Sequence, residues 1–480
     1  MINTVASVVV SGGWIETTLG KLAEYITSGS RDWSRYYADA GAIFIRTQDI
    51  NQNRLSLEEV AFVKLPEMVE GKRSLVRKGD LLVTITGANV GKVAVVEGEI
   101  PEAYVSQSVC LVRLKDPSLA KFIHLQLTAK RGDKTTVESM AYGLGRPVLN
   151  LDNIRSAPIR VAPAKVQVVI VAEIEKQFSR LDEAVANLKR VKANLKRYKA
   201  SVLKAAVEGK LTEDWRKQHP DAEPASKLLE RILVERQGKW EGRGQCKEPF
   251  EVNMSEPPVL AIGWMWTTID ALTITGPQNG LYLPQSLYGD GIPILRIDDF
   301  QDGWSRASDE LQKVRASPAQ VRAYCLDDGD FVINRVNSPT HLGKALVVQQ
   351  KHLPAIFESN MMRLRLSSHI QTPFIALYLQ SIDGRRRLTK NAKWAVNQAS
   401  INQVDVGMTE LPLPPFKEQQ CIVNEVERRL SVIDELEAAV EVNLTRADRL
   451  RQSILSQTFS GRLLLGQRNE EQPTTGSLSR

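Results

Sequence analysis

Cysteine and histidine are scarce in this chain of 480 residues, and long hydrophobic runs are missing. The four cysteines are scattered without Cys-x-x-Cys spacing, so we expect neither a disulfide scaffold nor a cysteine zinc site. This pattern is consistent with a protein of the reducing cytoplasm. The five histidines show no metal-ligand spacing, so no metal is expected. No apolar stretch approaches the roughly 20 residues of a membrane helix, and residues 1–13 lack the basic start of a secretory signal.

Catalytic motifs are also missing. Residues 86–92 resemble a phosphate loop, but they have three residues between the glycines instead of four, and valine follows Lys92 where Ser or Thr would hold magnesium. The stretch Leu413-Pro-Pro-Phe416 lacks the asparagine of an amino-methyltransferase motif, and the common nuclease core is not visible. We therefore expect no catalytic residues in this chain and predict that it is not an enzyme.

The chain carries a modest excess of positive charge. Its 63 lysines and arginines exceed its 56 acidic residues by 7, which favours a polyanionic partner without proving one. Its length corresponds to about three domains, or to two domains with long connectors.

The strongest feature of the sequence is an internal duplication. Motifs of the first half return in the second half at an offset of 250 residues, which becomes 252 after a two-residue insertion in one loop. A period this long predicts two domain-sized units and not a solenoid. The matched pairs include Gly13-Trp14 with Gly263-Trp264, Gly41 with Gly291, Gly79-Asp80 with Gly329-Asp330, Gly91-Lys92 with Gly343-Lys344, and Asn150 with Asn402.

The second part of each copy is predicted to be a long helix. Each helix follows an extended stretch ending in proline, and each carries apolar residues at every seventh position, which indicates a coiled coil. Where lysines interrupt the first seam, we expect Val191 and Tyr198 to take the partner position. The heptad positions are Ile174, Leu181, Leu188, Leu195 and Val202 in the first copy, and Val426, Ile433, Val440, Ala447 and Ile454 in the second.

The expected fold class is α+β, because the first part of each copy reads as short strands between turn signals. Two β-rich domains would be separated by two long helices that pair as an antiparallel coiled coil, about 60 Å long, with an internal pseudo-two-fold axis. That length exceeds one turn of B-DNA, about 34–36 Å. The predicted boundaries are 1–160 for the first β-rich domain, 161–211 for the central helix, 212–262 for a connector with a short amphipathic helix at 225–237, 263–410 for the second domain, 411–465 for the C-terminal helix and 466–480 for a disordered tail.

Polar loops of the β-rich domains are the candidate nucleic-acid contacts. Arg, Asn and Gln distinguish guanine and adenine edges through bidentate hydrogen bonds, and Lys and Arg suit phosphates. Such residues are more often simply solvated, and the matched Arg46 and Arg296 more often maintain a fold than read a base. The candidates are Ser30, Arg31, Trp33, Arg46, Gln48, Asn89, Lys92, Arg146, Gln278, Asn279, Arg296, Asn334, Arg335, Asn337, His341, Lys344, Arg385, Arg386, Lys390 and Lys393.

Taken in order, these motifs resemble the specificity subunit of a Type I restriction–modification system. The resemblance covers nearly the whole chain and rests on the duplicated order of domain and helix, on the domain entries at 13–19 and 263–269, and on residues 413–420 before the second helix. Residues 211–216 are similar to a segment found in part of the family. The first copy departs from the Pro-Pro-x-x-Glu-Gln pattern, because it reads Pro163-Ala-Lys-Val-Gln167.

The resemblance implies that this chain reads double-stranded DNA and leaves the chemistry to partners. Each β-rich domain would be a target-recognition domain for one half of an asymmetric bipartite sequence, and the helices would set the spacer and dock two methyltransferase subunits. The methyltransferases would bind S-adenosylmethionine, and separate restriction subunits would use ATP and Mg²⁺. No cofactor is expected in this chain itself.

Two other classes of protein remain open. A stand-alone DNA enzyme with an unrecognised active site would methylate or cut DNA as the pure chain. A coiled-coil adaptor that binds only protein would lack the steep salt dependence of electrostatic DNA binding.

Overall fold

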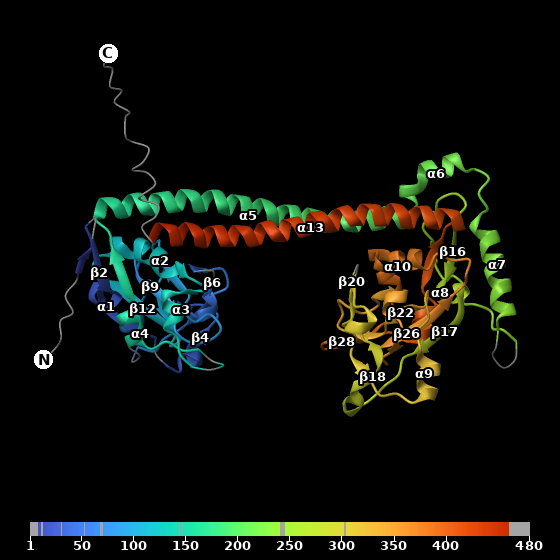
Figure 1. Cartoon of the computed structure of the whole chain (residues 1–480), viewed down its shortest axis with the longest axis horizontal. Helices are drawn as coiled ribbons and strands as arrows, with labels where there is room; N and C mark the ends of the chain where they lie inside the picture. The colour runs from blue at the N-terminus through green and yellow to red at the C-terminus, as the bar shows by residue number, and fades with distance from the viewer. Residues whose placement is uncertain are drawn as a thin grey trace, which may run out of the picture. The chain divides into compact units, whose positions relative to one another are not determined.

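A computed structural model describes residues 8–10, 13–29, 31–51, 53–67, 71–143, 145, 147–240, 245–301 and 304–459, and its elements are labelled in Figure 1. The chain forms two compact units. Unit 1 comprises Met1–Lys189 and Glu441–Arg480, and unit 2 comprises Arg190–Val440. Both long helices therefore contribute residues to both units. Among the described residues, no helix is long and apolar enough to cross a membrane.

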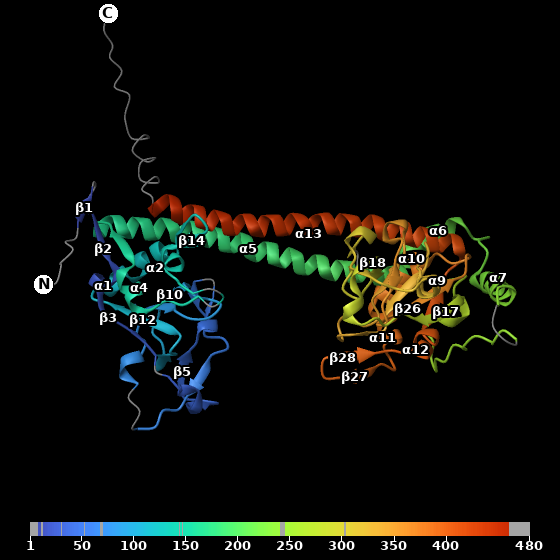
Figure 2. The ribbon, with the colours of Figure 1, turned by 60° about the horizontal axis from the view of Figure 1, so that its bottom comes forward.

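A four-stranded antiparallel sheet lies at the centre of unit 1, in the order β10-β9-β12-β3. The residues of β9 and β12 are buried throughout, because both faces of this sheet are covered. Leu81 and Val83 pack with helix α2, whereas Leu82 and Leu111 pack with a second sheet, β11-β5-β8-β4. Figure 2 shows α2 and β5 on opposite sides of β12. The bounds are β3 Ala23–Ser28, β4 Tyr37–Ala38, β5 Ala42–Ile45, β8 Ala61–Val63, β9 Leu81–Thr84, β10 Val93–Val95, β11 Ala103–Val105, β12 Val109–Leu114 and α2 Ala120–Thr128.

Smaller elements complete unit 1. Strand β2 pairs with β1 on one side and with β15 on the other, next to the start of the first long helix. The bounds are β1 Val8–Val10, β2 Trp14–Thr18, α1 Leu19–Leu22, β6 Ile50–Asn51, β7 Arg54–Leu55, β13 Lys130–Arg131, β14 Lys134–Thr135, α3 Thr136–Ser139, α4 Leu151–Ser156 and β15 Pro158–Val161.

Unit 2 repeats this topology, and its two central strands pair in the same register as those of unit 1. Along β17 and β26 the register shifts by one residue relative to unit 1 after Thr275. Its central sheet has the order β17-β26-β22-β24, and Ile333 faces Met362 as the matched Val83 faces Cys110 in unit 1. The duplication predicted from sequence is therefore a duplication of fold. The bounds are β16 Met265–Thr268, α8 Ile269–Leu272, β17 Thr273–Asn279, β18 Tyr288–Leu295, β19 Phe300–Gln301, β20 Trp304–Ser305, β21 Lys313–Val314, α9 Pro318–Tyr324, β22 Phe331–Asn334, β23 Val336–Asn337, β24 Ala345–Val347, β25 Ile356–Phe357, β26 Met361–Leu366, α10 Thr372–Gln380, α11 Ile382–Leu388, β27 Lys393–Ala395, β28 Gln398–Ser400, α12 Gln403–Gly407 and β29 Glu410–Leu413.

The two long helices are α5 (Ala164–Val207) and α13 (Phe416–Phe459), each of 44 residues. In unit 1, Ile174 shares a core with Phe459, and Asp182 further along α5 pairs with the earlier Arg451 of α13. In unit 2, Lys199 pairs with Asp434 at 3.5 Å. Within each unit the two helices thus run antiparallel, which confirms the α+β class with two β-rich parts and paired long helices.

The predicted heptad seam is buried along α13 but only partly along α5. Val426, Ile433 and Val440 are buried, as expected of seam residues. Val191 and Tyr198 are instead exposed, which corrects their assignment to the seam. The reason is that a pair of helices covers only one stripe of each helix, and in α5 this stripe includes the half-buried Leu188 and Leu195 but not Val191 or Tyr198.

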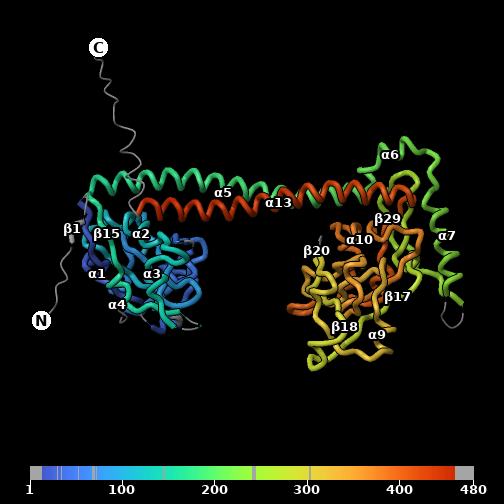
Figure 3. The backbone as a smooth tube through the Cα atoms, in the orientation of Figure 1, coloured from blue at the N-terminus to red at the C-terminus, as the bar shows by residue number. Residues whose placement is uncertain are grey.

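The connector between the copies packs on unit 2 through its short helices, α6 (Glu213–Gln218) and α7 (Ala225–Gly238), which Figure 3 follows along the backbone. Leu228 and Ile232 of α7 are fully buried in the unit 2 core. At the start of α13, the buried carboxylate of Glu418 accepts hydrogen bonds from Trp264 Nε1 (2.9 Å) and from Thr212 of the connector (2.6 Å).

Candidate nucleic-acid interface

Each unit presents three matched segments, two loops that follow strands and a hairpin, and these segments carry eight of the twenty predicted contacts. We call them the strand-end loop, the central loop and the hairpin. In unit 1 they are residues 46–49, 86–91 and the described residues of 142–148, and in unit 2 they are residues 296–299, 336–343 and 393–400. The matched asparagines Asn150 and Asn402, which follow the hairpins, cap helices α4 and α12.

In unit 1, hydrogen bonds join the three loops into one surface. Asn89 Nδ2 of the central loop donates to the Thr47 carbonyl of the strand-end loop at 3.2 Å. Thr86 pairs with Val148 of the hairpin, where Tyr142 and Val148 exchange backbone hydrogen bonds of 3.0 and 2.9 Å. Gln48 is exposed on the strand-end loop of this surface.

In unit 2, the central loop and the hairpin form a small sheet in the order β23-β28-β27. Val336 faces Ser400, at the positions matched to Thr86 and Val148. The Ile401 amide also donates to the Arg335 carbonyl at 2.9 Å. The base of the hairpin is therefore fixed to the central loop by backbone pairing.

Helix α11 adds positive charge beside these loops. Arg385 donates from Nη1 to the Leu342 carbonyl of the central loop at 3.2 Å, which holds the helix against it. Arg386 is 74% exposed and pairs with Asp383 of its own helix. Arg387 turns inward, where its guanidinium lies 4.8 Å from the Trp266 ring centre.

The structure divides the predicted contact residues by exposure. Ser30 and Arg146 lie outside the described residues. Trp33, Asn334 and Lys344 are buried. The exposed candidates are Arg31, Gln48, Asn279, Arg386, Lys390 and Lys393, and the half-buried ones are Arg46, Asn89, Lys92, Gln278, Arg296, Arg335, Asn337, His341 and Arg385.

The buried candidates have internal roles. Trp33 packs at 5.4 Å from Tyr104 and 5.9 Å from Phe44, measured between ring centres. Asn334 is fully buried at the end of β22, and its amide has no hydrogen-bond partner within the described part of the chain. Burial removes these side chains from the surface that a duplex could contact in this conformation.

Several half-buried candidates form internal pairs. Arg46 forms an ion pair with Asp49 (3.1 Å), and this hydrogen-bonded carboxylate raises the pKa of Arg46. The matched Arg296 instead pairs with Glu358 at 3.5 Å, and burial raises the pKa of that carboxyl group. Lys92 lies 3.4 Å from Glu138. These groups have intramolecular partners that hold the loops.

His341 and Gln278 also have internal partners. His341 Nδ1 lies 2.9 Å from the hydroxyls of both Ser338 and Thr340, inside the central loop. Gln278 accepts from Arg363 of β26 and donates to the Ala323 carbonyl at 3.2 Å. Asn279 beside it is exposed.

Two exposed aromatic residues are absent from the predicted contacts. Trp394 is 61% exposed on the unit 2 hairpin, and Tyr142 is 54% exposed at the matched position of unit 1. The signal that could have found them is the constant offset of 252 residues, which aligns the two aromatic side chains.

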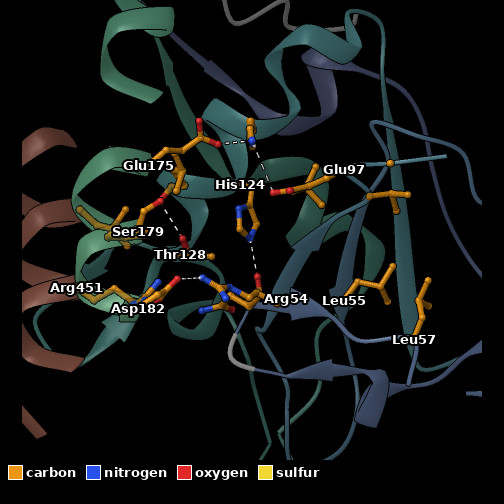
Figure 4. A pocket seen from close by; sticks show the side chains of 18 of the residues that line it. Arg54, Leu55, Leu57, Glu97, His124, Thr128, Glu175, Ser179, Asp182 and Arg451 are labelled. Carbon is orange, nitrogen blue, oxygen red and sulfur yellow. Dashed lines mark hydrogen bonds and ion pairs between the residues drawn. The ribbon is translucent and has the colours of Figure 1, made fainter. Parts of the chain in front are cut away.

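A second candidate site is a cavity of about 690 Å³ in unit 1, shown in Figure 4. Its charged groups satisfy one another: Asp182 pairs with Arg54 at 2.7 Å and with Arg451. His124 Nε2 donates to the carbonyls of Asn53 and Val93 at 2.9 and 3.0 Å, and burial lowers its pKa. This network joins the β-rich part of unit 1 to its long helices and assigns the cavity a structural role.

Comparisons with known proteins agree with this arrangement. A family model described as the Type I restriction modification DNA specificity domain matches residues 12–197 and 285–445. The chain is 25% identical over 464 residues to the Type I restriction enzyme StySPI specificity subunit of Salmonella potsdam, covering 94% of this chain and 89% of that protein. It is 24% identical over 465 residues to the EcoKI specificity subunit of Escherichia coli K12, with the same coverage.

A solved structure shares the fold. A chain from a study of complex assembly and conformational transition of the type I R-M system superposes with a TM-score of 0.59 at 19% identity. The superposition covers 95% of this chain and 100% of that chain.

Proposed function

The chain belongs to the Type I restriction–modification DNA specificity family, whose general role is DNA recognition, and we propose that it reads a bipartite target with one unit for each half. The observation that carries this proposal is the repetition of one scaffold with different loops. The register of the two central strands matches residue for residue between the units, while the exposed side chains on the three loops differ. Two units that share a scaffold but differ in their loops could each recognise a different half of an asymmetric DNA sequence.

The base contacts are assigned to exposed or half-buried polar side chains of each unit, of which Gln48, Asn89 and Asn337 lie on the three loops. In unit 1 they are Arg31, Gln48 and the half-buried Asn89, and in unit 2 they are Asn279 and Asn337. Amide and guanidinium groups can pair with two atoms of one base edge and so distinguish bases in the major groove. These roles are proposals for each residue.

The phosphate contacts are assigned to the cations beside the unit 2 hairpin. Lys390 and Lys393 are exposed, and neither forms an ion pair with another described residue. Lysines of this kind release counterions from DNA when they bind phosphates, which makes affinity depend on salt.

Partner subunits are proposed to dock on the exposed apolar flanks of the long helices. Val191, Tyr198 and Leu436 are exposed on the helices in unit 2, and Val168 and Leu450 are exposed on those in unit 1. Burial of such side chains by helices of two methyltransferase subunits would stabilise a complex. Restriction subunits would join through the assembled complex.

Specificity subunits are the non-catalytic members of these complexes, and we extend this to the present chain. The methyltransferase partners would bind S-adenosylmethionine, and the restriction partners would bind ATP and Mg²⁺. The residues of this chain would select and hold the DNA while the chemistry takes place on the partners.

Co-expression of the chain with the methyltransferase subunit encoded beside it tests the proposal. Single-molecule sequencing of host DNA would map N6-methyladenine, with the methyltransferase alone as control. We expect methylation at one gapped motif, and only when this chain is present. Co-purification without methylation would support the adaptor alternative, and methylation by the pure chain would support an enzyme.

Salt dependence tests the phosphate contacts separately. The variant K390A/K393A should reduce the slope of log affinity against log salt concentration by about one unit for each phosphate contact removed. The matched control is K227A, a lysine that is exposed on connector helix α7 and pairs with Glu230. Equal slopes for both variants would contradict the assignment.

A further inference from the structure

We propose that the unit 2 hairpin is a wedge that inserts the ring of Trp394 into the base stack of bound duplex DNA, with Tyr142 in the matching place of unit 1. This inference rests on the proposed function, because it needs DNA to lie against the loops of each unit. It assigns a further role to Trp394 and Tyr142, which are not among the proposed polar base contacts. This role is to open one base step next to the three loops of each unit.

The shape of the hairpin suits insertion. Strands β27 and β28 are joined by a two-residue turn, Val396 and Asn397, and Trp394 lies opposite Ala399. Trp394 is 61% exposed and Val396 is 99% exposed, so the apolar end of this ribbon faces solvent. The ribbon can be followed at the rim of unit 2 in Figure 2.

The base of the hairpin is anchored in the core of unit 2, whereas its tip is exposed. Ala399 and Ile401 are each 1% exposed in the core, and β28 pairs with β23. A ring held on an anchored two-stranded ribbon loses little conformational freedom when it binds. A two-stranded ribbon also fits within a DNA groove.

The positive charge around the hairpin favours DNA, and not an apolar protein surface, as the partner. Residues 384–404 contain five lysines and arginines and no acidic residue. Of these, Arg386, Lys390 and Lys393 are exposed around the hairpin. Interfaces between proteins are depleted in lysine at their centre, whereas phosphate contacts require it.

The matched position in unit 1 provides an independent observation. The bridge between Thr86 and Val148 is the counterpart of the pair between Val336 and Ser400, so Tyr142 lies in the segment that matches the Trp394 hairpin. The register within the two hairpins differs by one residue, because Tyr142 faces Val148 whereas Trp394 faces Ala399 and not the matched Ser400. The surrounding side chains of the two hairpins differ, yet each carries one exposed aromatic ring. A single exposed aromatic residue needs no explanation, but an exposed aromatic residue at the aligned sequence position of two diverged copies does.

Aromatic and apolar side chains act on DNA in a known physical way. Wedges inserted between base pairs unstack one step and kink the duplex, and the extra contacts offset the unstacking cost. Base-to-aromatic stacking tolerates any sequence, because every base has a flat face. The wedge would therefore contribute affinity and distortion, while the polar loop residues contribute sequence selection.

The test uses the full chain and a duplex that contains the gapped motif found by methylation mapping. Adenines of each half are replaced in turn by 2-aminopurine, whose fluorescence rises when its stacking is lost. The chain is used without methyltransferase, so that base flipping by a partner does not contribute. We expect a rise at one step in each half with the wild-type chain.

The variants W394A and Y142A should each abolish the rise in one half only. W394A should weaken DNA binding about tenfold, as expected for the loss of one stacked base. W394F should keep most of both effects, because it keeps an aromatic face. The control variant W240A removes an exposed tryptophan from the connector, and it should change neither the fluorescence rise nor the DNA affinity.

Distinct outcomes separate this proposal from the proposed function. If the wild-type chain shows no sequence-dependent DNA binding, both are overturned. If W394A binds, distorts and directs methylation as the wild type does, the wedge is overturned and the reading function stands. If W394A keeps DNA affinity and distortion but no longer retains the methyltransferase, the ring is a protein contact and the wedge is wrong.

Discussion

At the scale of single residues, the duplicated Gly-Asp signature is explained by an ion pair of a buried carboxylate. Asp80 pairs with Arg113 at 2.6 Å in unit 1, and Asp330 pairs with the matched Arg365 at 2.8 Å in unit 2. In both copies the same carboxylate also accepts a backbone amide three residues earlier, from Arg77 at 2.7 Å in unit 1. The pair fixes the entry of a central strand against the neighbouring strand.

Removal of one partner should be strongly destabilising. The variant D80A leaves the largely buried guanidinium of Arg113 uncompensated, so the free energy of unfolding of unit 1 should fall by about 3–5 kcal/mol. Urea unfolding measures this loss. The exposed Asp133 supplies the control D133A, which should change stability by less than about 0.5 kcal/mol. Equal effects of the two variants would contradict the structural role of the pair.

The sequence indicated the importance of Gly79-Asp80 but could not identify Arg113, which lies 33 residues away and meets Asp80 only through strand pairing. Trp33, Asn334 and Lys344 were predicted as surface contacts and are buried. Residue type and loop position do not report burial, because burial depends on which distant segments fold over a loop.

At the scale of elements, local patterns predicted the helices well. The period of seven found both long helices, and the amphipathic pattern placed the connector helix at 225–237, where α7 spans Ala225–Gly238. The domain boundaries stay a prediction. Contacts divide each long helix between the two compact units, and such a division is set by tertiary packing that no local pattern contains.

Helix α7 is held on unit 2 by a carboxylate as well as by apolar side chains. Burial alone would raise the pKa of Glu235, but hydrogen bonds donated by Lys239, Ser367 and Ser368 hold it at about 2, below its ordinary value of 4.5. Because this pKa is lower in the folded state, its stabilising contribution is present above about pH 4.5 and is lost as the pH falls towards about 2.

The variant E235A should therefore loosen α7 at neutral pH, by roughly 1–3 kcal/mol of local stability, and should remove the acid-dependent part of that stability. Hydrogen exchange of peptides that cover α7, measured at pH 7, 5 and 3 after correction for intrinsic rates, reports the change. E230A alters an exposed carboxylate on the same helix and serves as control. Parallel pH profiles for wild type and E235A would contradict the assignment.

At the scale of the whole molecule, unit 1 is built from two separate stretches of chain and unit 2 from one. Leu455 and Phe459, near the end of α13, are buried in the core of unit 1, where the Phe459 ring lies 5.5 Å from that of Phe122. Residues more than 300 positions apart thus complete one hydrophobic core.

Truncation after Val440 should separate the stabilities of the two units. Loss of Phe459 alone corresponds to about 3–5 kcal/mol, so unit 1 should unfold at a much lower temperature while unit 2 keeps its transition. Differential scanning calorimetry with limited proteolysis would identify each transition. Truncation after residue 465, which removes only the predicted tail, should leave both transitions in place. If truncation after Val440 lowered the unfolding temperature of unit 2 together with that of unit 1, the division of the chain into these two units would be contradicted.

The divided core of unit 1 also sets an order of events during synthesis on the ribosome. Unit 1 begins first, yet Leu455 and Phe459 are translated after every residue of unit 2. Unit 2 has all of its residues once Val440 has left the exit tunnel, so the second copy can finish folding while the first still exposes part of its core. In a nascent chain, the core of unit 1 is therefore completed only near the end of translation, although most of unit 1 is synthesised first.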